Sequence, residues 1–328
     1  MKILITGITG RIGANLAAAL VGAGHQVRGL VWDRDPRVEK LAGLGVELVY
    51  GSITRPDEAA AAVAGVEVVY HLGAAFQGGG PFTEDEYFEI NVRGTFNMLE
   101  AARRQRGIRQ FLFAGTDALY EKYVPGGMLE PITEETPRRP RGAYALTKSV
   151  GEELVNGYFL GHGLPTTILR FAMVLGAGEI LDFPQFYLSK MKDSAQELAA
   201  LWQGEEGLVA LKDDQGRYYK KHVAEVRDIV HGCVCALGCE AAYGQTFQLA
   251  GPRPFTWDEA VGQLSVALDL PVVEAQVSGI PTYYEFDITK ARRLLGFNPQ
   301  FDLGRMIADA LRFRQGEDVG LLPTRLED

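Results

Sequence analysis

Short apolar runs alternate with longer segments of helical period along the first half of the chain. The runs are rich in Val, Ile and Leu, which is typical of parallel strands buried on both faces. Parallel neighbours need crossover connections, and the intervening segments are long enough to form helices. The predicted strands are 3–6, 27–31, 46–50, 66–71, 108–114 and 166–171, and the predicted helices between them are 11–23, 36–42, 55–64, 84–105 and 143–160. This order predicts an α/β fold with a doubly wound parallel sheet.

Three glycines follow the first predicted strand and open the first predicted helix. In that context Gly7 permits a tight turn, Gly10 lets the backbone approach a pyrophosphate at the helix N-terminus, and Gly13 allows close packing of helix on strand. Arg11 and Ile12 lie between the last two glycines and share the turn. The motif therefore predicts a Rossmann domain that binds a dinucleotide.

The regular alternation ends after Gly176, where aromatic, charged and Gly-rich stretches take over. A chain of 328 residues exceeds a typical single core and favours one large domain plus a smaller one. We predict an NAD(P)-binding Rossmann domain over 1–175 and a smaller C-terminal α/β substrate domain over 176–328, with the chain re-entering the first domain near 222–240. The helical segments expected there are 184–201, 223–237, 257–268, 287–297 and 303–313.

The residues after the second predicted strand bear on the choice between NAD and NADP. An acid there binds the ribose hydroxyls of NAD, whereas an arginine accepts the 2′-phosphate of NADP. The strand runs into Trp32, Asp33 and Arg34, so an acid and a base are adjacent. The choice of cofactor stays open.

Tyr144 and Lys148 stand four residues apart on one face of a predicted helix. A phenol with a free pKa of about 10 becomes a usable acid or base near neutrality when a cation favours its phenolate. This pair therefore suits proton transfer.

The glycine turn and the Tyr–Lys pair, in this order and with these separations, resemble the extended short-chain dehydrogenase/reductase family, also called the NAD-dependent epimerase/dehydratase family. The resemblance continues through nearly the whole chain. It includes the segments 91–95, 111–120, 169–170 and 294–299.

The resemblance implies roles for further residues. Tyr144 would be the general acid/base, Lys148 would hold the phenolate and the ribose hydroxyls, and Thr116 would hydrogen-bond the reacting oxygen. Further cofactor contacts are implied for Ser52, Ile53, Leu72, Gly73, Ala74 and Asn91. Candidate substrate-pocket residues are Phe76, Gln77, Asp117, Tyr120, Met173 and Phe186.

The chain departs from the family pattern at the positions that hold a substrate diphosphate. Met173 occupies the slot of an asparagine in sugar-nucleotide members, and Tyr218 occupies that of an arginine, with Arg217 one residue out of register. Ala118 stands where dehydratases have a glutamate base, and elimination needs both an acid and a base. These departures disfavour a dehydratase and a nucleotide-sugar substrate, and they leave a simple dehydrogenase or reductase, or an epimerase that oxidises and re-reduces one carbon.

We therefore expect an NAD(P)-dependent oxidoreductase that transfers a hydride at a secondary alcohol or ketone of a small substrate, sugars included. One alternative is a sugar or nucleotide-sugar epimerase with bound NAD. A second is a non-catalytic cofactor-binding regulator. Relatives pair their two long helices across a two-fold axis, so the resemblance also implies a homodimer, with Phe88, Val92, Phe96 and Leu99 at helical spacing on 84–105.

Composition narrows the expected partners. The 42 acidic and 33 basic residues give a net charge of -9, which makes nucleic acid an unfavourable partner. No apolar run approaches the roughly 20 residues that span a bilayer, so we expect no membrane partner and a cytoplasmic location. Cys233, Cys235 and Cys239 do not have the spacing of zinc ligands or of a redox pair, and we expect no metal.

Overall fold

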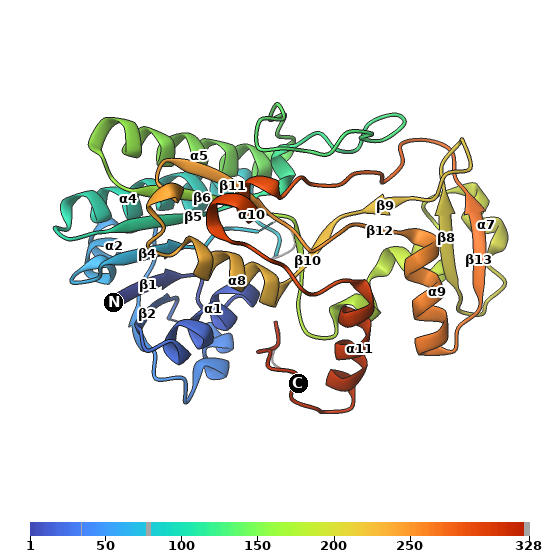
Figure 1. Cartoon of the computed structure of the whole chain (residues 1–328), viewed down its shortest axis with the longest axis horizontal. Helices are drawn as coiled ribbons and strands as arrows, with labels where there is room; N and C mark the ends of the chain where they lie inside the picture. Colours follow the sequence, from blue (N-terminus) through green and yellow to red (C-terminus); the bar gives the residue numbers. More distant parts are fainter. Residues whose placement is uncertain (34, 77–79, 325–328) are drawn as a thin grey trace.

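A seven-stranded parallel sheet forms the centre of the larger part of the molecule in the computed structural model, which describes residues 1–33, 35–76 and 80–324 (Figure 1). The strand order is β11-β6-β5-β4-β1-β2-β3. The bounds are β1 Lys2–Thr6, β2 Gln26–Val31, β3 Glu47–Tyr50, β4 Val68–His71, β5 Gln110–Thr116, β6 Thr166–Phe171 and β11 Gln245–Leu249. The strand order reverses between β1 and β4, as it does in a doubly wound fold. The predicted fold class is confirmed.

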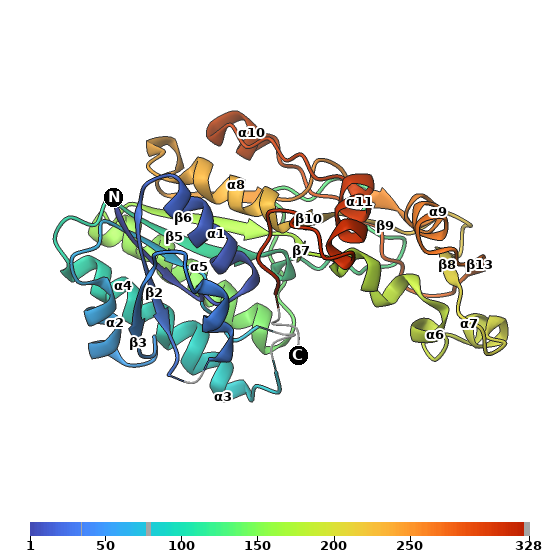
Figure 2. The same cartoon turned by 90° about the horizontal axis from the view of Figure 1, so that it is seen from below.

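Helices cover both faces of this sheet (Figure 2). One face carries α2 (Pro56–Val63), α4 (Gly94–Arg104) and α5 (Gly142–His162), and the other carries α1 (Arg11–Gly22) and α8 (Val226–Ala236). Each layer encloses its own apolar cluster, centred on Phe111 and Val155 on the first face and on Leu16 and Ile229 on the second. The strands are thus buried on both sides, as their continuous apolar sequences indicate.

A smaller unit extends from the carboxyl ends of the strands (Figure 1). It contains β8 (Leu208–Lys212) parallel to β13 (Val272–Gln276), and its core includes Phe186 and Trp257. Its helices are α6 (Leu188–Met191), α7 (Gln196–Leu201), α9 (Trp257–Leu268) and α11 (Leu303–Arg314). Four short strands connect the two parts: β7 (Met173–Leu175) pairs with β10 (Val223–Glu225), and β9 (Lys220–Lys221) pairs with β12 (Phe255–Thr256). The segments β11, α8 and α10 (Thr289–Leu295) follow residue 175 in the chain but pack with the large sheet.

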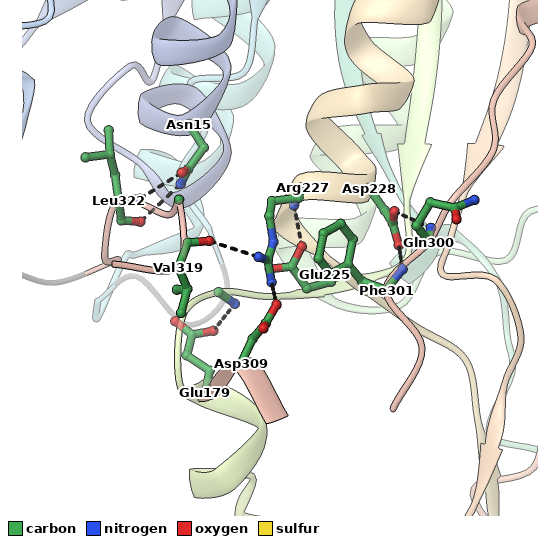
Figure 3. Close-up of polar contacts among 12 residues, drawn as sticks. Asn15, Glu179, Glu225, Arg227, Asp228, Gln300, Phe301, Asp309, Val319 and Leu322 are labelled. Carbon is green, nitrogen blue, oxygen red and sulfur yellow. Dashed lines mark hydrogen bonds and ion pairs between the residues drawn. The ribbon is translucent and has the colours of Figure 1, made fainter. Parts of the chain in front are cut away.

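Polar contacts fasten the C-terminal segment to the helices α1 and α8 (Figure 3). The amide of Asn15 accepts a hydrogen bond from the backbone N–H of Leu322 at 2.9 Å and donates to its carbonyl at 3.1 Å. Arg227, at the start of α8, donates to the Val319 carbonyl and pairs with Asp309 of α11 at 2.8 Å. These bonds fix α11 and the following residues against the Rossmann part.

Several predicted segments differ from the observed ones. The prediction missed β11, because its sequence contains two glutamines and a threonine. The amide of Gln248 is buried and donates to the Ile132 carbonyl, so its polarity is satisfied inside the protein. The predicted helix 36–42 is the 3-10 helix Pro36–Leu41, and 184–201 is broken into the 3-10 turn Pro184–Phe186 and two short helices. The segment 223–237, predicted as one helix, is the short strand β10 followed by the helix α8.

The predicted helix 84–105 is interrupted at its centre. A capping box at Thr83 starts α3 (Glu84–Tyr87), and a π-helical stretch, Phe88–Arg93, separates it from α4. Asn91 lies in this stretch, and its buried side chain binds the backbone of Ala75. Such stretches often occur where a helix positions a functional group. No helix in the described parts of the chain is both long enough and apolar enough to cross a membrane.

Candidate active site

The glycine turn joins β1 to the N-terminus of α1. Gly7 has a φ of +70°, and a Cβ there would lie 2.8 Å from the backbone of Gly73. At Gly13 a Cβ would lie 2.2 Å from the Gly7 carbonyl oxygen. Both positions therefore require glycine.

The N-terminus of α1 is suited to an anion. Its N-cap residue is Gly10, and the first turn has neither a side-chain cap nor an acidic residue. The first N–H groups of a helix have no acceptor within the helix and carry a partial positive charge. Among the described residues, a Cβ at Gly10 would have only the Gly7 carbonyl oxygen, at 3.2 Å, within 4 Å. This cradle fits the pyrophosphate of a dinucleotide.

The side chain of Arg11 points to the second part of the protein. Its guanidinium donates to the Val174 carbonyl at 2.6 Å and pairs with Glu179 at 2.6 Å. A further bond reaches the hydroxyl of Thr324. Arg11 and Ile12 can therefore contribute to the cradle through the backbone, while the Arg11 side chain links the turn to β7 and the C-terminal segment.

The loop after β2 contains an acid that the sequence analysis did not single out. Trp32 is 53% exposed and Asp33 is exposed, whereas Arg34 lies outside the described residues. Asp35 accepts a hydrogen bond from Thr9 of the glycine turn at 2.6 Å and pairs with Arg37. Partial burial opposes ionisation of Asp35, but the bonds from Arg37 and Thr9 outweigh it and lower its pKa to about 2. Asp35 is thus a fixed anion beside the turn.

The segments after β3 and β4 also lie at the carboxyl ends of the strands, and the segment after β4 approaches the glycine turn, because a Cβ on Gly7 would meet the backbone of Gly73. Ser52 hydrogen-bonds Thr54, and Ile53 packs against Gly94. The Leu72–Gly73–Ala74 turn follows β4, and the Gly73 N–H donates to the Thr6 hydroxyl at 3.0 Å.

Buried side chains hold this second turn in place. Asn91 binds both backbone groups of Ala75 and donates to Thr147 of α5 at 3.0 Å, so it joins the turn to the helix that carries Tyr144. His71 hydrogen-bonds Thr6 and Thr95. Burial, together with the charge of Lys148, lowers the pKa of His71 to about 3, so this imidazole is a neutral brace.

Thr116, Tyr144 and Lys148 come together at the carboxyl edge of the sheet. Thr116 ends β5, and Tyr144 lies in the first turn of α5. Burial raises the pKa of Tyr144 to about 12, and the neighbouring Thr116 hydroxyl acts in the opposite direction. The rings of Phe76 and Tyr87 pack edge-on against Tyr144, with centroids at 5.8 and 6.4 Å.

Lys148 lies one turn after Tyr144 on α5 and has no polar partner in the described residues. Its side chain is 4% exposed, and its Nζ lies 4.0 Å from the centre of the Phe113 ring. Burial lowers the pKa of this ammonium to about 8, although Glu152 favours the charged form. Three unused N–H donors at this position suit the hydroxyls of a cofactor ribose.

The predicted substrate residues fall into different environments. Met173 is 37% exposed at the start of β7, and Asp117 is buried and paired with Lys122. Tyr120 is buried, and its hydroxyl accepts a bond from Arg170 at 2.6 Å. Phe186 is fully buried in the core of the smaller unit, 5.5 Å from the Trp257 ring. Gln77 lies outside the described residues.

Comparison with known proteins gives a consistent result. The model of the NAD dependent epimerase/dehydratase family matches residues 3–250. The crystal structure of a short-chain dehydrogenase/reductase superfamily protein from Agrobacterium tumefaciens, solved with bound NAD, is 33% identical, with a TM-score of 0.84 over 96% of this chain and 98% of the other. The chain belongs to this family. Among curated family relatives, a 3-beta-hydroxysteroid dehydrogenase of Mycolicibacterium neoaurum is 26% identical over 95% of this chain and 91% of its own length. The uncharacterized UDP-glucose epimerase YtcB of Bacillus subtilis is 27% identical over 92% and 94%.

Family membership makes the chain an NAD- or NADP-dependent enzyme of the extended short-chain type, a dehydrogenase, reductase or epimerase. The resemblance inferred from the glycine turn and the Tyr–Lys pair is thereby confirmed. The individual roles of the site residues stay predictions, supported by the geometry described above.

The Gly13→Ala variant tests the glycine turn. The added methyl must displace the Gly7 carbonyl, so we expect the free energy of unfolding to fall by about 1–3 kcal/mol. We also expect NAD to bind at least about tenfold more weakly, measured by calorimetric titration. The control is Gly22→Ala at the other end of α1, where a Cβ has no neighbour within 4 Å. Equal NAD affinity in both variants would contradict this view of the turn.

Proposed function

We propose that this enzyme transfers a hydride at a secondary alcohol or ketone of a small substrate, with Tyr144 as the general acid/base. The observation that carries the proposal is the grouping of Thr116 and Tyr144 with the ammonium of Lys148, which has no polar partner among the described residues. Relatives named as dehydrogenases and ketoreductases support a reaction between an alcohol and a ketone.

The residues divide the work in a simple way. NAD or NADP supplies the hydride acceptor or donor when bound. The backbone of the glycine turn would hold the pyrophosphate, and Lys148 would bind ribose hydroxyls and stabilise the Tyr144 phenolate. In oxidation, the phenolate takes the proton of the substrate hydroxyl while Thr116 hydrogen-bonds the same oxygen. In reduction, the phenol returns that proton.

The epimerase reading is the second candidate, and the likeness to the YtcB protein favours it. An epimerase of nucleotide sugars must bind the diphosphate while the sugar ring rotates to present its other face to the cofactor. Arg217 pairs with Asp213 at 2.8 Å and donates to the Gly126 carbonyl, and the hydroxyl of Tyr218 donates to Glu274. Since these groups are engaged within the protein, we prefer net oxidation or reduction. A non-catalytic regulator would have no need of the complete catalytic group.

The Tyr144→Phe variant tests the proposed acid/base. It removes the proton carrier and keeps the ring, so we expect turnover to fall by at least about 10²-fold with NAD affinity nearly unchanged. The rate is measured from the absorbance of reduced nicotinamide, with alcohols, sugars, sugar acids and nucleotide sugars as candidate substrates. The control is Tyr158→Phe on the same helix, which loses a bond to Glu100 and should retain turnover within about twofold. Wild-type turnover in Tyr144→Phe would refute the assignment.

We further propose a homodimer formed through α4 and α5. Phe96 is 43% exposed and Phe88 is also exposed, and together with Val92 and Leu154 they line a shallow, mainly apolar groove that Arg93 also lines. Leu99, one turn after Phe96 on α4, is fully buried in the core. Exposed aromatic side chains of this kind mark interfaces between subunits.

Sedimentation velocity tests the dimer. We expect Phe96→Glu to sediment as a monomer at micromolar concentration, because it places a charge in the apolar interface. Val266→Glu, on the exposed surface of α9, should remain dimeric. A wild-type monomer, or a Phe96→Glu dimer, would rule out this interface.

A further inference from the structure

Lys221 carries a buried ammonium group whose polar partner is neutral. The side chain is 4% exposed, and its Nζ donates to Oε1 of Gln185 at 3.2 Å and lies 4.9 Å from the centre of the Phe183 ring. No carboxylate within the described residues pairs with it. A buried charge is costly unless an opposite charge compensates it. Lys221 can therefore bind an anion that the described part of the protein does not supply.

The strand pairing places Lys221 at the edge of the sheet where Thr116 lies. Thr116 stands opposite Phe171 at the end of β6, and the next strand, β7, pairs Met173 with Val223. Lys221 is two residues before Val223, so it lies beside the carboxyl ends of β5 and β6. Asp117 lies near both Tyr144 and Lys221, because its negative charge acts to raise the pKa of each of them.

The neighbouring charges leave Lys221 as a positive charge without a negative partner of its own among the described residues. Asp117 is already paired with Lys122, whose Nζ also donates to the Asp117 carbonyl at 3.3 Å and lies 5.1 Å from the centre of the Tyr284 ring. Burial lowers the pKa of Lys221 to about 8, and the charge of Lys122 adds to this effect. One carboxylate beside Lys221 would balance the three charges.

Resting on the proposed function, we propose that Lys221 and Gln185 bind a carboxylate group of the substrate, which is therefore a hydroxy acid or sugar acid. The carboxylate forms an ion pair with Lys221 and accepts a hydrogen bond from the amide Nε2 of Gln185, and the hydroxyl that reacts lies at Tyr144.

The donor set matches one carboxylate. Oε1 of Gln185 is used by Lys221, and its Nε2 has no acceptor among the described residues. The backbone of Gln185 is held by a bond from Trp257 Nε1 to its carbonyl at 3.4 Å. One ammonium and one amide N–H suit the two oxygens of a carboxylate, whereas a diphosphate calls for further cations.

The test compares acids with their neutral counterparts in wild-type protein, Lys221→Met and Lys220→Met. The compounds are hexuronates against the parent hexoses, and hydroxy acids against the corresponding amides, with NAD and with NADP. We expect wild-type protein to prefer an acid, and Lys221→Met to raise its KM by about ten- to a hundredfold, since a charge-assisted bond is lost. Lys220 pairs instead with Glu285, so Lys220→Met should keep the wild-type preference.

Two results would overturn this inference. In the first, the best substrate of wild-type protein is a neutral compound. In the second, the ratio of kcat/KM for an acid to kcat/KM for its neutral counterpart is the same in Lys221→Met as in wild-type protein. In either case the proposed redox function stands. Calorimetric titration of the acids into Tyr144→Phe protein with NAD covers the opposite case, in which the carboxylate site exists but the proposed function is wrong. Suppose that the acids bind to Tyr144→Phe protein, that adding Lys221→Met abolishes this binding, and that wild-type protein oxidises none of the compounds. That result supports the carboxylate site and refutes the proposed function.

Discussion

The buried carboxylate of Glu152 fixes the helix that carries Tyr144 and Lys148. It accepts bonds from Arg170 of β6 at 2.8 and 3.0 Å and from Arg138 at 3.2 Å, and it has no exposed surface. A Cβ at Gly115 would lie 2.7 Å from it, so this glycine in β5 makes room for the charge. Removing one partner of such a buried pair typically costs about 3–5 kcal/mol. Since Glu152 lies one helical turn after Lys148, this network sets the position of α5 against β5 and β6, on which the geometry of the site depends.

Two buried ammonium groups lie at the same edge of the sheet, and we propose that they bind the cofactor and the substrate. Lys148 faces an aromatic ring and Lys221 an amide oxygen, and neither is neutralised by an adjacent carboxylate within the described residues. Burial lowers the pKa of both. Fixed, desolvated charges of this kind interact more strongly with a ligand than exposed ones and need no rearrangement when the reaction begins. In the proposed mechanism Lys148 serves the cofactor and the phenolate, and Lys221 serves the substrate.

The sequence predicted the layers of the fold because buried parallel strands leave a continuous apolar pattern, and β6 and α9 have the predicted bounds. It failed at β11, where the buried amide of Gln248 donates to the distant Ile132 carbonyl, and at the π-helical stretch around Asn91. Thr116, Tyr144 and Lys148 could be proposed from spacing and family resemblance. Asp35 and Lys221 could not, because an acid in a loop and a lysine in a polar stretch acquire meaning only through burial and through partners far along the chain.

The proposed function requires that the enzyme completes a net oxidation or reduction and then exchanges its cofactor. The most direct test mixes cofactor-free protein with a substrate found by screening and a molar excess of NAD or NADP, and follows the absorbance of reduced nicotinamide. We expect a signal that passes one equivalent per active site and continues until substrate or cofactor is consumed. Interconversion of two sugar stereoisomers by protein that carries tightly bound NAD, without added cofactor and without net absorbance change, would contradict it.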